Sequence, residues 1–215
     1  ATHLTLKYWA TKFHSLQRRR LETAAVSRDS IRLSHQTSPG ATAWLTVPPT
    51  AALGNSCPPG QFRLLLRWFL GIQILENTLA GQPCPLCGDP VDVFGDHAVS
   101  CEKAARYKRH FAVQDWILRL LQSHGIACAR EKAIEPTSAH RAADIFIPNW
   151  SSLGDMAIDV TVRHPLPPGL FPATPNSSAE LLSRVEAEKR SHYEDMCNRQ
   201  SCQFQPLVLT TCCLL

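Results

Sequence analysis

Residues 142–162, AADIFIPNWSSLGDMAIDVTV, contain two β-rich runs with turn signals between Asn149 and Gly154. Each of the runs AADIFIP and DMAIDVTV has an aspartate flanked on both sides by apolar residues, Asp144 in the first and Asp159 in the second. A charged group inside an apolar strand is costly unless a partner compensates it. The stretch therefore predicts two neighbouring strands whose aspartates could converge on one divalent cation.

The segments on either side of these strands indicate an α/β fold. The expected elements, in chain order, are a helix at 106–125, strands at 126–134, 142–148 and 155–162, a helix at 177–198 and a strand at 202–211. Gly125 is typical of a helix C-terminus, and Ser177 or Ser178 of an N-cap. The prolines of residues 165–178 exclude regular structure between the third strand and the last helix. The predicted order is thus helix, three strands, helix, strand.

The bulk composition is that of a globular protein with a hydrophobic core. The chain has 215 residues, of which 44% are hydrophobic and 19% charged, and its net charge of +4 permits a polyanionic partner. The longest apolar run, residues 64–75, contains Arg67 and is too short to span a bilayer. No secretion signal is recognisable. We expect no membrane partner, no secretion, and residence in the nucleus or cytoplasm.

Three regions are expected along the chain. Residues 1–56 read as an N-terminal helical and linker segment, in which residues 4–26 form an amphipathic helix with a basic end at Arg18, Arg19 and Arg20. That basic end is either a solvated helix face or a nucleic-acid contact. Residues 57–104 contain a helix at 62–74 and a cysteine-rich module, and residues 105–215 contain the α/β domain. The first residue, Ala1, and the last residues, TTCCLL, suggest a fragment of a longer product, truncated at the C-terminus.

The cysteine-rich module, CPLCGDPVDVFGDHAVSC at residues 84–101, has metal-ligand spacing. Cys84 and Cys87 form a close pair, and His97 and Cys101 lie one helical turn apart on a helix that starts near Asp96. Three thiolates and one imidazole suit a tetrahedral, closed, structural Zn²⁺ site. The alternatives are free cysteines in a loop and, in a third reading, a disulfide-linked interaction protein. The remaining cysteines have no such arrangement and are expected to be buried or incidental: Cys57, Cys128, Cys197, Cys202, Cys212 and Cys213.

The acidic residues on the predicted strands suggest phosphodiester chemistry. Asp144 and Asp159 supply the oxygen ligands that Mg²⁺ prefers, and the bound ion can activate a water molecule. Lys189 would place a positive charge beside that water, and Tyr193, four residues later, projects from the same helix face. In the alternative interpretation both aspartates end strands at the surface and Lys189 is a solvated charge.

Together these residues resemble the C-terminal region of non-LTR retrotransposon polyproteins that carry a restriction-like endonuclease after the reverse transcriptase. The resemblance covers roughly residues 40–210 and is specific as an ordered set. It rests on WLTVPP, FRLLLRWFLGIQI, CPLC…GDHAVSC, RYKRH, RAADIFIPNW, AIDVTVRHPL and AEKRSHY. Such proteins place a Cys-Cys-His-Cys zinc motif before a nuclease of the PD-(D/E)XK superfamily, whose core is helix, three strands, helix, strand.

The resemblance implies roles for the acidic residues. Asp144 takes the place of the first Asp of the superfamily motif, although Ala143 precedes it where Pro is usual. Asp159 takes the (D/E) position, and Glu131 is a candidate additional acidic ligand. Two residues after Asp159 the motif lysine is replaced by Thr161.

The resemblance also implies roles for the basic residues. In this retroelement group the motif lysine is displaced onto the following helix, which fits Lys189, with Tyr193 completing the helix motif. Arg106, Arg109 and His110 are candidates for contacts with the DNA backbone.

The implied activity is Mg²⁺- or Mn²⁺-dependent nicking of target DNA by a domain that also holds a structural Zn²⁺. The implied partners are DNA, with element RNA as a further candidate, and the upstream reverse transcriptase domain. The chain itself contains no paired-aspartate polymerase core. The alternative is a catalytically inactive, retroelement-derived, zinc-containing protein that only binds nucleic acid or a partner.

Overall fold

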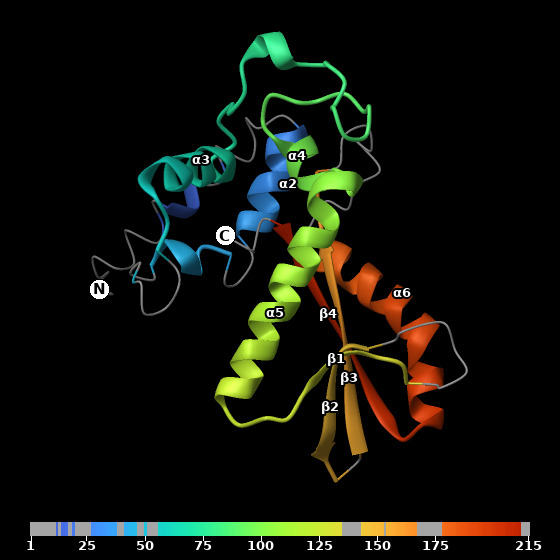
Figure 1. The fold of residues 1–215 in the computed structure, drawn as a ribbon. Helices are drawn as coiled ribbons and strands as arrows, with labels where there is room; N and C mark the ends of the chain where they lie inside the picture. The colour runs from blue at the N-terminus through green and yellow to red at the C-terminus, as the bar shows by residue number, and fades with distance from the viewer. Residues whose placement is uncertain are drawn as a thin grey trace, which may run out of the picture.

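The computed structural model describes residues 12, 14–16, 19, 27–37, 41–46, 50, 56–134, 143–152, 154–166 and 178–211. Its central feature is a four-stranded mixed sheet flanked by two long helices (Figure 1). The elements are α5 (Tyr107–Ser123), β1 (Ala129–Lys132), β2 (Ala143–Ser151), β3 (Gly154–Arg163), α6 (Ser178–Arg199) and β4 (Cys202–Thr210). The predicted α/β class and the predicted order of elements are confirmed.

The sheet combines antiparallel and parallel pairing. Strands β1, β2 and β3 pair antiparallel in chain order, and β4 lies parallel to β3. A parallel neighbour requires a crossover connection, which α6 supplies here. The predicted turn between the two aspartate-bearing strands is confirmed, with Ser151 paired to Gly154.

The two central strands separate at one end of the sheet. Their pairing extends as far as Ile145 opposite Ile158. Beyond that pair, β2 remains paired with β1 and β3 remains paired with β4. The next residues along the separating strands are Asp144 on β2 and Asp159 on β3, so both aspartates lie where the sheet opens.

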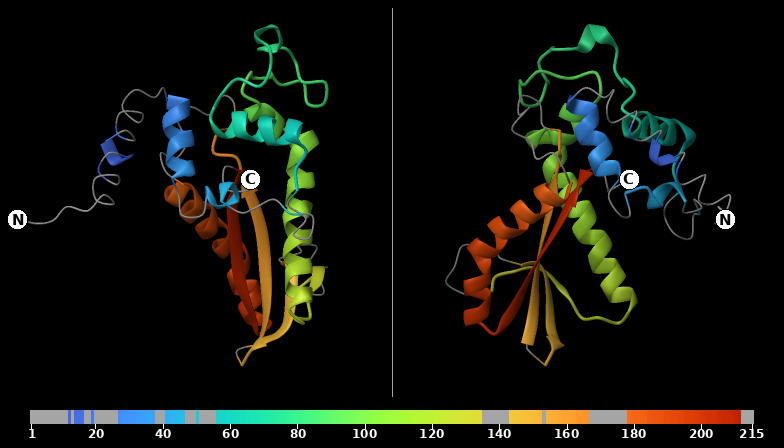
Figure 2. Two further views of the ribbon diagram at one scale, coloured as in Figure 1. Left: turned by 90° about the vertical axis from the view of Figure 1, so that its left-hand side faces the viewer. Right: turned by 180° about the vertical axis from the view of Figure 1, so that it is seen from behind.

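Helices cover both faces of the sheet (Figure 2). On one face, α5 packs through an apolar stripe that includes Leu118, against Ile145, Ile147 and Val160. On the other face, α6 contributes to a core formed by Ile134, Ala143, Phe146, Ala157, Met196, Cys197, Cys202 and Phe204. A fully buried side chain of this size contributes about 1.5–3 kcal/mol relative to an exposed one, so these two layers hold the sheet in place.

The residues before α5 form short helices and loops. They are α2 (Ser27–Gln36), η1 (Ala43–Leu45), α3 (Pro59–Phe69), η2 (Asn77–Leu79), α4 (Asp96–Ser100) and the π-helix η3 (Glu102–Arg106). The helix expected at 62–74 is present as α3, which begins three residues earlier with Pro59 in its first turn, where proline costs no hydrogen bond. Of the helix expected at 4–26, residues 12, 14–16 and 19 are helical, whereas Arg18 and Arg20 lie outside the described residues.

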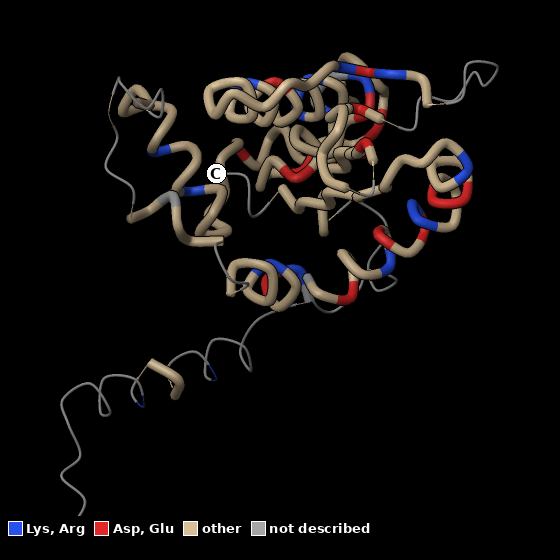
Figure 3. Tube along the Cα trace, turned by 90° about the horizontal axis from the view of Figure 1, so that it is seen from below, with Lys and Arg blue, Asp and Glu red and all other residues tan. Residues whose placement is uncertain are grey.

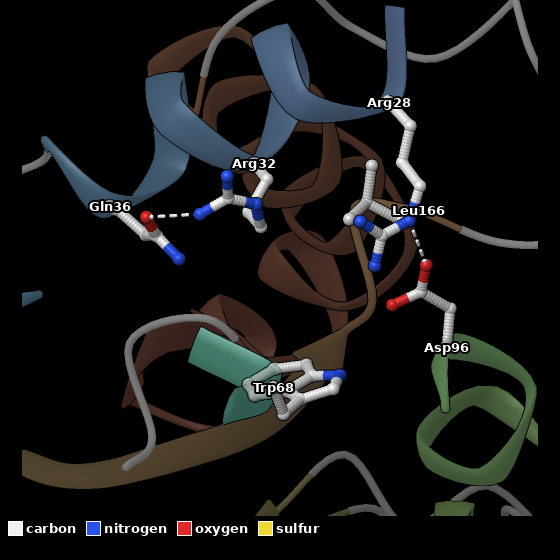
Figure 4. Close-up of a pocket in the computed structure, with 6 residues that line it drawn as sticks. All are labelled: Arg28, Arg32, Gln36, Trp68, Asp96 and Leu166. Carbon is white, nitrogen blue, oxygen red and sulfur yellow. Dashed lines mark hydrogen bonds and ion pairs between the residues drawn. The ribbon is translucent and has the colours of Figure 1, made fainter. Parts of the chain in front are cut away.

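A buried polar junction joins these short helices to the α/β domain (Figure 4). Arg28 of α2 forms an ion pair with Asp96 of α4 at 2.6 Å. Trp68 of α3 stacks on His164, which follows β3, with ring centroids 6.3 Å apart. The fully buried His35 of α2 lies nearby, close enough to affect the charge of His164. One buried cluster of side chains therefore joins the helical segment, the cysteine-rich module and the end of β3.

Charged residues of both signs are interspersed along the described chain (Figure 3). The sequence carries 22 Lys and Arg against 18 Asp and Glu. Among the described residues, no helix is both long enough and apolar enough to cross a membrane.

Replacing Gly154 with alanine is expected to destabilise the fold. Gly154 has φ of 112°, and an added Cβ would collide with the backbone oxygen of Ser201. Backbone in this region costs a residue with a side chain about 1–3 kcal/mol, and a main-chain oxygen cannot rotate away. Urea unfolding followed by circular dichroism should show a free energy of unfolding at least about 1 kcal/mol lower. Gly60→Ala is the control, because an added Cβ there meets no atom within 4 Å; equal losses would contradict the prediction.

The junction histidines should make the fold acid-sensitive. Burial lowers the pKa of His35 to about 4 and that of His164 to about 3, so both rings are neutral in the folded chain at neutral pH. In the unfolded chain a histidine takes up a proton below a pH of about 6.5. The unfolded state then binds more protons, so the free energy of unfolding falls as pH decreases from about 6.5 towards 4.

His35→Leu is expected to flatten this pH dependence, because it removes a titrating ring whose nitrogens have no hydrogen-bond partner in the described structure. The free energy of unfolding of the wild type, from urea titrations, should fall by about 2 kcal/mol more than that of the variant between pH 7.5 and 5. The exposed His124→Gln serves as the control. Parallel pH profiles for the wild type and His35→Leu would refute the assignment.

Candidate functional site

Four side chains from the cysteine-rich module meet around one point. The sulfur atoms of Cys84, Cys87 and Cys101 and a ring nitrogen of His97 all lie within 4.8 Å of one another. Cys84, His97 and Cys101 are buried, and the Cys87 sulfur lies 3.4 Å from His97 Nε2. Zn²⁺ prefers these donors in closed structural sites. The cluster is therefore compatible with zinc.

A tight loop presents the first two ligands. The Cys84 amide donates to the Asp89 carbonyl at 2.8 Å, and the Gly88 amide donates to the Cys84 carbonyl at 2.9 Å. Gly88 has φ of 86°, a conformation that glycine adopts without a Cβ penalty. The loop therefore brings the Cys87 thiol back towards the Cys84 thiol.

Helix α4 presents the other two ligands, and Asp92 fixes its start. The Asp92 carboxylate accepts hydrogen bonds at 2.5–3.1 Å from the backbone amides of Phe94, Asp96 and His97. A carboxylate at this place satisfies amides that have no partner within a helix. The Cys101 amide donates to the His97 carbonyl at 2.7 Å, which keeps the two ligands one turn apart.

The thiols of Cys84 and Cys87 have opposite tendencies to ionise. Backbone amides of Cys87 and Leu86, followed by the His97 ring, lower the pKa of Cys84 to about 6. The Asp89 amide lowers the pKa of Cys87, but burial and the neighbouring thiols of Cys101 and Cys84 outweigh it and raise that pKa to about 12. The protein alone thus favours a thiolate at Cys84 over one at Cys87, and a bound divalent cation would allow Cys87 to ionise as well.

The other described cysteines lie outside this cluster. Cys197 and Cys202 are buried, whereas Cys57 and Cys128 are partly buried, and Cys212 and Cys213 lie outside the described residues. Cys84, Cys87 and Cys101 are free thiols rather than disulfide-bonded.

A second site forms where β2 and β3 separate. The Asp144 carboxylate accepts a hydrogen bond from the backbone amide of Val160, the neighbour of Asp159, at 2.7 Å. Its other oxygen lies 3.4 Å from His110 Nε2 on α5. Gln114, one turn further along α5, donates to the Asp144 carbonyl at 2.6 Å. Asp144 is therefore held by β3 on one side and by α5 on the other.

Asp159 is buried and is held by two side chains. Lys189 Nζ on α6 donates to one carboxylate oxygen at 3.1 Å, and Thr161 Oγ1 donates to the other at 2.9 Å. The Lys189 ammonium also lies 5.6 Å from the centroid of the Tyr193 ring, which packs against Phe204. Thr161, two residues after Asp159, thus contributes a hydroxyl group to this site. The positive charge beside Asp159 comes from Lys189 on α6.

The His110 ring links the two carboxylates electrostatically. A hydrogen bond to Asp144 is the main cause that raises the pKa of His110, and the charge of Asp159 adds to it in spite of partial burial of the ring. One imidazole therefore lies within the influence of both aspartates, and the structure brings His110, Asp144, Asp159 and Lys189 together.

Glu131 lies on the neighbouring strand. The pairs on either side of it, Arg130 with Ile145 and Lys132 with Ala143, place it beside Asp144 along the sheet. Its φ of 47° is unusual for a residue with a side chain. Among the described residues, the cysteine–histidine cluster is the one group of three or more potential ligands close enough to hold a metal ion, so Glu131 does not complete a three-carboxylate group.

The residues expected to contact the DNA backbone lie in different environments. Arg106 is exposed and forms an ion pair with Glu102 at 3.2 Å. Arg109 is partly buried, and its Nε and one terminal nitrogen are shielded from solvent without a hydrogen-bond partner in the described structure. His110 contacts Asp144. The proposed DNA contacts of these residues stay a prediction.

Gln114 is a site residue that the sequence did not indicate. It follows His110 by four residues and so lies on the same helix face, and a polar residue in an otherwise apolar stripe was the available signal. Its side chain is completely buried, and it fixes the β2 backbone at Asp144.

Cys87→Ser is expected to abolish tight zinc binding. A serine hydroxyl remains protonated where a thiolate would ionise, so the tetrahedral donor set is lost. Metal analysis of the purified chain should find about one zinc per wild-type chain and far less in the variant. Cys57→Ser, outside the cluster, is the control. Zinc retained by Cys87→Ser, or lost equally from the control, would show that the four residues do not hold it.

Comparisons with family models, with curated proteins and with solved structures found no match to this chain.

Proposed function

We propose that this chain is the target-nicking DNA endonuclease portion of a non-LTR retrotransposon polyprotein, with a restriction-like, PD-(D/E)XK core. The observation that carries the proposal is the separation of β2 and β3 at their two aspartates. There Asp144 binds the amide next to Asp159, and Lys189 binds Asp159 itself. The order of elements over α5, β1, β2, β3, α6 and β4 is the order that the resemblance implies.

The two carboxylates have the chemistry to hold Mg²⁺ or Mn²⁺. Each of their four oxygens has one partner among the contacts described above. Because a carboxylate oxygen can accept two hydrogen bonds, these contacts leave each oxygen a second lone pair for a metal ion. When bound, such an ion stabilises charge on a phosphoryl oxygen and lowers the pKa of its water. Asp144 and Asp159 would bind and orient it.

Lys189 would complete the site. Its ammonium is held by Asp159 and is only partly exposed, so its charge is concentrated where the scissile phosphate would lie. The Tyr193 ring restricts the side chain on the same helix face. Zn²⁺ in the Cys84–Cys101 module would have no chemical role, because four protein donors leave no open position.

The replacement of the motif lysine by Thr161 favours a second candidate function. The Thr161 hydroxyl already binds Asp159, so catalysis would depend on a lysine from another element. Without that function, the chain would be a catalytically inactive, zinc-containing protein that binds nucleic acid or a partner.

Nicking of supercoiled plasmid separates the two functions. The purified wild type should convert plasmid to the open circular form only when Mg²⁺ or Mn²⁺ is added. Asp159→Asn and Lys189→Gln should each slow this by about a hundredfold or more, since each removes a charge that acts at the reacting phosphate. Asp195→Asn, an exposed carboxylate on the same helix as Lys189, should nick at the wild-type rate.

Zinc content should be equal in all four proteins, which verifies that the variants are folded. Nicking that persists in Asp159→Asn would exclude this site as its source. Absent nicking by a zinc-loaded wild type would leave the binding function.

A further inference from the structure

One stripe of α5 faces the sheet. Residues at spacings of three and four along this helix include Gln114 and Leu118, both buried. His110, one turn before Gln114, reaches Asp144, and Phe111 packs edge-on against the His110 ring with centroids 5.4 Å apart. A helix stripe of this kind is normally covered by the structure that it faces.

The first turn of this stripe is uncovered. Tyr107 precedes Phe111 by four residues and lies on the same side of α5, yet it is 69% exposed, and Phe111 is 38% exposed. Figure 1 shows that α5 starts at the end of the molecule that holds α4 and runs from there along the sheet. Tyr107 therefore continues the inward-facing stripe beyond the point where His110 meets Asp144, and Phe111 lies one turn behind it.

The charges around Tyr107 favour an anionic occupant. Lys103, Arg106 and Lys108 surround it within one turn on either side, and Glu102 is the acidic residue among them, paired with Arg106. An exposed tyrosine between cations is the arrangement in which proteins stack a base while neutralising its phosphates. A protein partner with an apolar patch would gain nothing from these cations.

We propose that Tyr107, with Phe111 behind it, stacks on an unpaired base of the DNA strand whose phosphate lies at Asp144 and Asp159. This inference rests on the proposed nuclease function and adds its substrate class: DNA that is single-stranded or locally unpaired beside the cut. In a continuous duplex every base is already stacked on its neighbours, so the rings would have no free base to contact.

The distances allow one strand to reach both places. Tyr107 precedes His110 by three residues, which is about 4.5 Å along a helix axis. Successive nucleotides of a DNA strand rise by about 3.4 Å. A base on Tyr107 would therefore belong to a nucleotide within about two of the phosphate at the carboxylates.

The test compares binding of one 20-nucleotide DNA carrying 2-aminopurine, either alone or annealed to its complement, with Ca²⁺ in place of Mg²⁺. Tyr107→Ala should weaken binding of the single strand by about fivefold to 150-fold, the effect of losing one base–aromatic stack. The fluorescence change of 2-aminopurine should disappear with it, while duplex affinity changes less than twofold. Tyr107→Phe keeps the ring and should retain both signals.

Trp116→Ala is the matched control. Trp116 is 60% exposed on the same helix, but it follows Tyr107 by nine residues and so lies on the opposite face. Equal losses of single-strand binding in Trp116→Ala and Tyr107→Ala would overturn the proposal. So would unchanged binding in Tyr107→Ala, or tighter binding of an RNA of the same sequence than of the DNA.

Plasmid nicking distinguishes failure of this inference from failure of the nuclease function. Suppose that the wild type nicks plasmid but cuts a duplex with a mismatched bubble no faster than a matched duplex. The chain would then be a nuclease, and the stacking role would be refuted. Ring-dependent binding of the single strand by a chain that never nicks would support the stacking surface and remove the nuclease.

Discussion

The hydrogen bond from the Val160 amide to the Asp144 carboxylate holds the open end of the sheet together. Where β2 and β3 separate, the strands no longer satisfy one another's backbone groups. A buried amide left without a partner costs about 1–3 kcal/mol, so the opening requires a side-chain acceptor. Asp144 supplies it, and in doing so its carboxylate is fixed at the amide that follows Asp159. The same constraint that stabilises the sheet therefore shapes the second candidate site.

The zinc module and the carboxylates are connected through α5. Cys101 immediately precedes the π-helix η3, which leads directly into α5. A metal ion on Cys101 would fix the start of this helix, and His110 and Gln114 lie one and two turns further on. On the other side, Asp96 anchors the module to Arg28 and thus to α2. The described segments before α5 therefore influence where His110 lies.

The sequence predicted the helices, the strands and the Cys–His cluster better than it predicted side-chain contacts between distant segments. The strands around Asp144 and Asp159, the last helix and the Cys–His cluster follow from local patterns, because periodicity and ligand spacing are properties of neighbouring residues. The DNA contact predicted for His110 stays a prediction, and the contact of its ring with Asp144 had no local signal. The buried His35 likewise had no local signal. Both depend on how α5 and α2 pack against distant segments, which no short stretch of sequence encodes.

The position of the Lys189 ammonium depends on how α6 packs in the core and not on the backbone of β3. A lysine on β3 would be placed by the backbone of Asp159 itself, but Lys189 comes from α6. That helix is packed on both sides of Lys189, through Leu181 and Val185 towards its start and through Met196 and Cys197 towards its end. A shift of α6 by a fraction of a turn would break the 3.1 Å contact with Asp159. Because close-packed interiors resist such shifts, the apolar residues of α6 keep the Lys189 charge beside Asp159.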